Sequence, residues 1–89
     1  MNSAQKQTLA RIMGQPTPAN LRWSEIESAL RALECEISEG CGSRVRVALN
    51  GVRAVFHRPH PSPQAKQSSV HAVRDFLTLA GIKTETWDA

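Results

Sequence analysis

Acidic residues are missing from a long central part of this 89-residue chain. Residues 40–74 contain no Asp or Glu, although the formal net charge of the whole chain is only +3. The basic residues of this part are Arg44, Arg46, Arg53, Arg58, Lys66 and Arg74. A segment in which only positive charge accumulates favours a polyanionic partner such as a nucleic acid, because lysine and arginine neutralise phosphates. A solvated sheet face without a partner is the alternative interpretation of the same charges.

Cysteines are few, and long apolar runs are absent. The chain has two cysteines, Cys35 and Cys41, and no stretch with the length and apolarity of a membrane span. Neither a secretory signal nor a transit-like segment is recognisable. These absences predict a cytoplasmic protein with reduced thiols.

Several motifs of catalysis and binding are absent as well. Ser43 has no activating triad in the sequence, and Gly40-Cys41-Gly42 is too short for a phosphate-binding glycine loop. Aromatic residues do not interleave with the basic ones, which argues against a platform that stacks single-stranded bases. If the polyanionic partner is an RNA, its recognition would therefore use contacts with its backbone and its 2′-hydroxyl groups.

The clearest structural signal is the alternation of apolar and polar residues on both sides of Asn50-Gly51. This dipeptide favours a two-residue type I′ turn, so the segment 43–61 is predicted to form a β-hairpin with a fixed register. The predicted apolar face pairs Leu49 with Val52, Val47 with Ala54, and Val45 with Phe56. The opposite face pairs Arg44 with His57, Arg46 with Val55, and Ala48 with Arg53, with Arg58, Pro59 and His60 following directly.

Helical patterns flank the hairpin. In residues 1–20, Leu9, Ile12 and Met13 fall on one side of a short helix before prolines break it, which predicts an arm that packs on the domain or on a partner. A capping box of Ser24 and Glu27 predicts the start of the next helix. Its apolar stripe is Ile26, Leu30 and Leu33, with Trp23 packed beside it and with Glu25, Glu27 and Arg31 facing solvent.

The remaining elements complete one small domain. Cys35 and Ile37 alternate with polar residues and predict a short first strand. The last helix has an apolar stripe of Val70, Val73, Leu77 and Ala80, a possible N-cap at Ser68 or Ser69, and a glycine stop at Gly81 followed by Ile82. For the tail 83–89 an edge strand and an irregular end both stay open. The prediction is an α+β protein of order αβββα, with a three-stranded antiparallel sheet, two helices on one face and an N-terminal helical extension.

This order resembles the HicA family of toxins. The resemblance covers residues 21–82 and is carried by Gly42-Ser43 at the start of the second strand, by the run HRPHP after the third, and by the helix VHAVRDFLTLAGI. It implies a fold like a double-stranded-RNA-binding domain, endoribonuclease activity on mRNA, and inhibition by a HicB-type antitoxin. With it, residues 1–20 are interpreted as an arm and linker, 21–82 as the domain and 83–89 as a tail.

One position departs from the family pattern. Family members typically have Gly-Ser-His where this chain has Gly42-Ser43-Arg44, and that histidine is regarded as catalytic, so the role cannot be transferred. Three chemistries stay open: Arg44 stabilises the phosphate while His57 supplies acid or base catalysis; His60 takes the catalytic part; or the protein has lost nuclease activity and only binds RNA or the antitoxin.

The remaining assignments concern phosphates and metals. The residues predicted to bind RNA phosphates are Arg46, Arg53, Arg58 and Lys66. No cofactor and no metal is predicted, since 2′-hydroxyl attack needs only a base, an acid and a cation. A zinc site of Cys35, Cys41, His57 and His60 is disfavoured by its spacing. The prolines after His57 are interpreted as a stiff connector, and His71 as an exposed residue.

Overall fold

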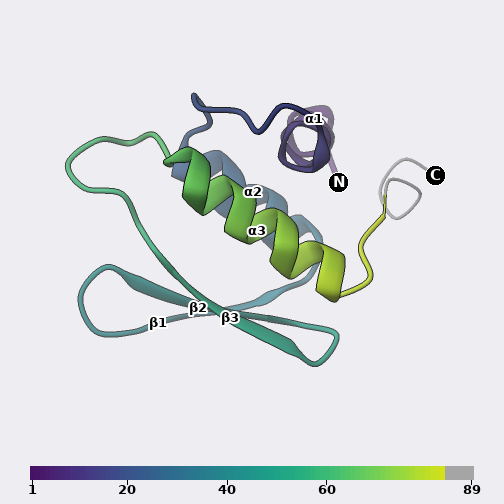
Figure 1. The fold of residues 1–89 in the computed structure, drawn as a ribbon. Coiled ribbons are helices and arrows are strands. Elements are labelled where there is room, and N and C mark those ends of the chain that lie inside the picture. Colours follow the sequence, from purple (N-terminus) through teal and green to yellow (C-terminus); the bar gives the residue numbers. More distant parts are fainter. Residues whose placement is uncertain (84–89) are drawn as a thin grey trace.

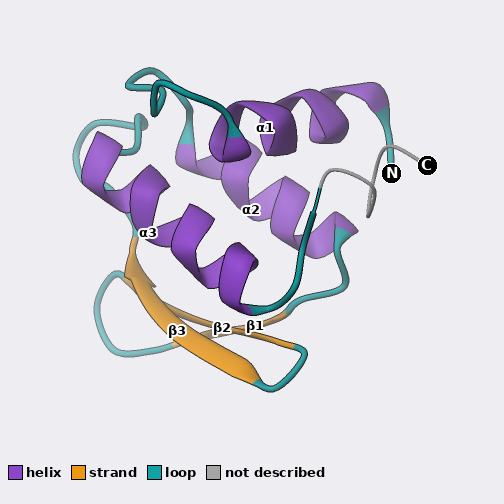
Figure 2. Cartoon of the chain, turned by 45° about the vertical axis from the view of Figure 1, so that its right-hand side comes forward, coloured by secondary structure: helices purple, strands orange, loops and turns teal. Residues whose placement is uncertain are grey.

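The computed structural model describes residues 1–83, so the predicted tail beyond Lys83 lies outside the described residues. Its elements are α1 (Ser3–Met13), α2 (Trp23–Ala32), β1 (Glu36–Glu39), β2 (Arg44–Leu49), β3 (Val52–His57) and α3 (Gln67–Leu79). The strands form one antiparallel sheet in the order β1-β2-β3. Both α2 and α3 lie on the same side of this sheet, and α1 lies on the far side of these helices (Figures 1 and 2). The predicted αβββα order with an N-terminal helix is confirmed.

The hairpin has the predicted register. Every cross-strand pair from Arg44–His57 to Leu49–Val52 is present. Asn50 and Gly51 both have positive φ, 51° and 82°, as the two-residue type I′ turn requires. The turn also contacts the last helix, because Asn50 Nδ2 donates a hydrogen bond to the carbonyl oxygen of Ala80 at 2.8 Å. Figure 1 shows this turn beneath the C-terminal end of α3.

The core lies between the inner face of the sheet and the helices. Phe56 of β3 is its centre, with its ring 6.0 Å from that of Trp23 and 5.9 Å from that of Phe76. Val45 and Val47 of β2 are buried beneath the same helices. The prediction that Trp23 packs in the core is confirmed.

Helix α1 belongs to the same core. Leu9 and Ile12 are both 0% exposed and lie in the cluster that includes the α2 and α3 stripes. Hydrogen bonds from Arg74 of α3 hold the end of α1 in place. The Arg74 guanidinium donates hydrogen bonds to the carbonyl oxygens of Ile12 (2.9 Å) and Gly14 (2.5 Å) and to Thr17 Oγ1 (3.0 Å). The extension therefore packs on the domain, one of the two possibilities left open by the sequence.

The predicted N-cap of α2 is wrong by two residues, with a consequence for the site. The N-cap is Arg22 rather than Ser24, and Glu25 Oε1 accepts a hydrogen bond from the Arg22 N–H at 3.2 Å. The backbone just before the helix is held extended by the loop after β3, because Trp23 N–H donates to Pro63 (3.0 Å) and Ala65 N–H donates to Leu21 (2.8 Å). Glu27, predicted to face solvent, is only 7% exposed.

Helix α3 ends as predicted and begins earlier. Its N-cap is Lys66, so neither Ser68 nor Ser69 caps it. At the other end Gly81 has φ +84°, and Ile82 N–H donates to Leu77 at 2.9 Å, which forms the Schellman-type stop. The predicted stripe of Val70, Val73, Leu77 and Ala80 is buried.

Candidate functional site

Arg44 and His57 face each other on the outer side of the sheet. They are register partners on β2 and β3, and both are exposed. The next pair is hydrogen bonded, because Arg58 N–H donates to Ser43 at 2.9 Å. Since hydrogen-bonded and non-hydrogen-bonded pairs alternate in an antiparallel ladder, Arg44 and His57 form a non-hydrogen-bonded pair, the type in which side chains lie closest, with Cβ atoms about 5 Å apart.

His57 also lines a hollow beside the sheet. This hollow has a volume of about 550 Å³ and lies between the end of β3, the loop that follows it and the start of α3. Its walls include His60 and Lys66 as well as Ser43 and Ser69. Four of the predicted site residues, His57, Arg58, His60 and Lys66, therefore line the same hollow. Because α3 begins directly after Lys66, the positive end of its dipole lies near the same wall.

The guanidinium of Arg58 points toward the helix side of the sheet, although the residue also lines this hollow. Side chains alternate along a strand, so the residue after His57 lies on the helix side of the sheet, as Phe56 does. Its guanidinium donates from Nε to Glu27 Oε1 at 2.7 Å and from Nη1 to Glu39 Oε1 at 2.9 Å. These hydrogen bonds, first to Glu27 and then to Glu39, raise the pKa of Arg58 further above its usual range. The placement of Arg58 on the outer basic face with its neighbours is wrong.

Glu27 is the buried acid at this point of the molecule. Its Oε1 also accepts a hydrogen bond from Trp23 Nε1 at 2.6 Å, and its Oε2 lies 3.6 Å from Arg31 Nη1. Burial by itself would raise the pKa of this carboxyl, but the hydrogen bonds from Arg58 and Trp23 and the charges of Arg58 and Arg31 outweigh it, so the pKa is lowered. Glu27 is therefore a charged group inside the protein at neutral pH.

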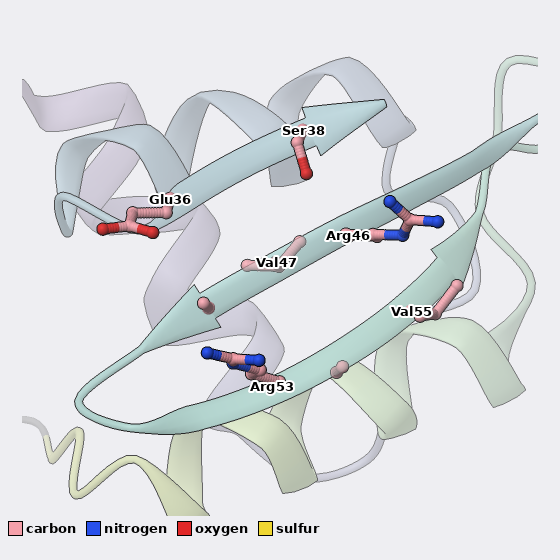
Figure 3. Close-up of a pocket in the computed structure, with 8 residues that line it drawn as sticks. Glu36, Ser38, Arg46, Val47, Arg53 and Val55 are labelled. Carbon is pink, nitrogen blue, oxygen red and sulfur yellow. The ribbon is translucent and has the colours of Figure 1, made fainter. Parts of the chain in front are cut away.

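A second, shallow hollow of about 500 Å³ lies on the outer face of the sheet. Figure 3 shows the side chains of Glu36, Ser38, Arg46, Arg53 and Val55 on this face, with the helices behind the sheet. The predicted phosphate contacts Arg46 and Arg53 line it, whereas His57 and His60 do not. The predicted site residues thus lie in two neighbouring regions, the outer face of the sheet and the first hollow. The Arg44–His57 pair lies at the end of the outer face that borders the first hollow.

Comparison with known proteins identifies the family. Residues 23–82 match the family model described as HicA toxin of bacterial toxin-antitoxin. The chain belongs to the HicA toxin family. No curated protein and no solved structure matches it. A HicA toxin is one component of a toxin-antitoxin system, its cognate antitoxin is the expected protein partner, and members of the family are generally endoribonucleases.

The HicA match begins at α2 and ends just after α3, so the sheet, the Glu27–Arg58 pair and the residues that line both hollows, except Ala19, lie inside it. Helix α1 and the whole linker after it, residues 14–22, lie outside. The linker still reaches the site region: Ala19 lines the first hollow, and Gln67 Nε2 donates to the carbonyl oxygen of Thr17 at 3.0 Å.

Not every charge of the acid-free stretch of this HicA protein faces outward. Arg58 is bound to two glutamates, and Arg74 donates to the end of α1 and to the linker. The remaining basic residues of the stretch are exposed: Arg44, Arg46, Arg53 and Lys66. These four side chains make up the outward positive charge of the site region.

Glu27 is the site residue that the sequence reasoning missed. A signal was present, because Trp23, Glu27 and Leu30 are spaced i, i+4 and i+7 and so lie on one helix face. The capping-box pattern of Ser24 and Glu27 gave the carboxylate another role and concealed this one.

Two further observations concern metals and membranes. Within residues 1–83, no three His, Cys, Asp or Glu side chains lie together in a group that could hold a metal ion. Among the helices of the same residues, none has both the length and the apolar character needed to cross a membrane.

Proposed function

We propose that this HicA-family toxin binds mRNA and cleaves it as an endoribonuclease, without a metal ion, until a HicB-type antitoxin inhibits it. The observation that carries the proposal is the position of His57. It is the partner of Arg44 on the outer face, and it lines the same hollow as His60 and Lys66. A scissile phosphate over the Arg44–His57 pair would thus meet two imidazoles and two cations.

The proposed chemistry uses attack of a 2′-hydroxyl on the neighbouring phosphate. One imidazole accepts the proton of the 2′-hydroxyl and another donates a proton to the leaving 5′-oxygen; imidazoles suit both steps because they exchange protons near neutral pH. His57 and His60 are the candidates for these two roles. Arg44 would stabilise the extra negative charge on the phosphorus oxygens, a role compatible with arginine in place of the histidine that the family pattern leads one to expect.

The neighbouring phosphates of the RNA would lie along the outward positive charge. Arg46 and Arg53 extend from the Arg44–His57 pair along the outer face, and Lys66 lies at the wall of the first hollow. Arg58, also predicted to contact phosphate, has its guanidinium bound to Glu27 and Glu39 in the free protein. An mRNA substrate places the activity in the cytoplasm.

A second candidate function is a non-catalytic module that binds RNA or the antitoxin. The observation that favours it is Arg44 itself, since an arginine at this position cannot act as the general base near neutral pH. The two functions share the binding step and differ in the chemical step after it, because only the first breaks the RNA chain.

The test is RNA cleavage by purified protein in the presence of EDTA, together with growth arrest on expression. His57→Ala and His60→Ala are each expected to lower the cleavage rate by about 100-fold or more, the usual contribution of an acid or base. His71→Ala is the matched control, because His71 is an exposed histidine on α3 that pairs with Asp75 and lines neither hollow. Cleavage at the wild-type rate by both site variants would refute the histidine chemistry, and RNA binding without cleavage by the wild type would establish the second function.

A further inference from the structure

We propose that Glu27, acting through Arg58, is a positioning residue for His57 and His60. The proposal rests on the proposed nuclease function and assigns a role within that site to the ion pair between the buried Glu27 and the partly exposed Arg58. Arg58 follows His57 directly and is separated from His60 by one proline, so any shift of Arg58 displaces both histidines.

The contacts of Arg58 join three parts of the fold. Its backbone N–H donates to Ser43, which fixes the end of the β2–β3 ladder. Its side chain binds Glu27 of α2 and Glu39 at the end of β1. The loop that carries His60 leaves the sheet at this point and runs to the start of α3 (Figure 1). The guanidinium therefore ties the point where the loop leaves the sheet to α2 and to the end of β1.

Glu27 is itself held in place. It is 7% exposed, and Trp23 Nε1 donates to the same oxygen that accepts from Arg58 Nε. The Trp23 ring packs on Phe56, two residues before Arg58 on β3. Trp23 holds the Glu27 carboxylate on one side, and Arg58 binds it on the other. This arrangement favours one position for the end of β3, because hydrogen bonds to charged groups are stronger than those between neutral groups. If Arg58 only contacted solvent or RNA, its partner Glu27 would not need to be buried.

A phosphate-contact role for Arg58 predicts different behaviour. If Arg58 bound RNA directly, Glu27 would compete with the substrate for the guanidinium, and replacing Glu27 by glutamine would strengthen RNA binding. Replacing Arg58 would then weaken binding and reduce its salt dependence, since one fewer phosphate would be neutralised. In the positioning role, the two replacements have the same effect, and that effect is on the rate of the chemical step.

The experiment is single-turnover RNA cleavage over a range of protein concentrations by Glu27→Gln, Arg58→Gln and the double variant, at a temperature where each is folded by circular dichroism. We expect each single variant to lower the maximal rate about 10- to 100-fold, the effect of a small misplacement of catalytic groups, with the half-saturating concentration changed less than about threefold. The double variant should be no slower than the slower single variant, because both remove one interaction. Arg31→Gln is the matched control: it removes the exposed partner of Glu27 and should leave the rate unchanged.

A readout without RNA separates this proposal from the nuclease function. The imidazole resonances of His57 and His60 in the free protein should shift in Glu27→Gln and Arg58→Gln and stay in place in Arg31→Gln. Glu39→Gln removes only the exposed contact of Arg58 and provides a folded variant if the buried ones unfold; it should shift the same resonances in the same direction, by less. Unshifted resonances, or wild-type maximal rates in folded Glu27→Gln and Arg58→Gln, would overturn the proposal. A wild-type protein that does not cleave RNA while these resonances shift would overturn only the nuclease function.

Discussion

Replacing Leu9 by alanine tests whether the N-terminal helix is part of the fold. Leu9 is 0% exposed and packs with Ile12 against the α2 and α3 stripes. The change removes three carbon atoms from the core, which at about 0.8 kcal/mol each is a loss of about 2.4 kcal/mol in burial, and the cavity left behind brings the expected destabilisation to about 3–5 kcal/mol. A chain of 89 residues has a total stability of roughly 4–13 kcal/mol, so this is a large share of it.

The assay is urea unfolding of the whole chain, followed by circular dichroism. At about 4–8 °C per kcal/mol, the melting temperature should also fall by roughly 12 °C or more. Gln7→Ala is the matched control, because Gln7 lies on the exposed side of the same helix, and it should change the stability by less than about 0.5 kcal/mol. If Leu9→Ala unfolds at the same urea concentration as Gln7→Ala, α1 contributes nothing to the core and its packing role is refuted.

Three further predictions concern the hairpin, the buried acid and the basic face. Asn50→Ala should destabilise the protein by about 2 kcal/mol in urea unfolding, because it loses the hydrogen bond to Ala80 and puts alanine at positive φ. Asn50→Gly loses only the hydrogen bond and should destabilise the protein by about 1 kcal/mol. Equal destabilisation by the two variants would contradict this reasoning. The pKa of Glu27 is lowered in the folded state, so its charge stabilises the fold above roughly pH 4.3, and this stabilisation is lost as the pH falls through the lower folded pKa. The stability advantage of wild type over Glu27→Gln should therefore shrink between about pH 6 and pH 3. A difference that stays constant over this range would refute the stabilising role of the Glu27 charge. Arg46→Gln with Arg53→Gln should reduce the slope of log K against log salt for single-stranded RNA by about 1.4, and an unchanged slope would exclude both from phosphate contact.

The hairpin register and the buried face of the sheet could be predicted because they depend on local signals. Asn50-Gly51 specifies the turn, a two-residue turn fixes the register, and the register decides which side of the sheet is buried. Gly81 and Ile82 are equally local, since a positive-φ residue and the bond back to Leu77 define the end of α3.

The helix starts could not be predicted, because tertiary contacts decide them. Ser24 has the right residue type for an N-cap, but the bonds of Leu21 and Trp23 to the loop after β3 place the first helical turn two residues earlier. Glu27 then turns inward toward Trp23, and its main charged partner is Arg58, which follows β3 and lies 31 residues later in the chain. A pairing of that separation leaves no local signature in the sequence.

The candidate site was predicted in its residue types and only partly in its arrangement. Cross-strand register placed Arg44 beside His57 because both lie in regular strands. His60 and Lys66 lie in or next to an irregular loop, so their approach to His57 depends on how Pro63 and Ala65 pair with the segment before α2. Arg58 was assigned to the outer face because the alternation was not continued past the end of β3.

The most direct test of the account is the chemistry of the RNA ends left by the wild-type protein. Purified protein incubated with mRNA in EDTA should produce fragments with 5′-hydroxyl ends and 2′,3′-cyclic phosphates, and His57→Ala should abolish these fragments while still binding the RNA. Fragments with 5′-phosphate ends, cleavage that requires an added divalent metal, or no cleavage by the wild type would contradict the account.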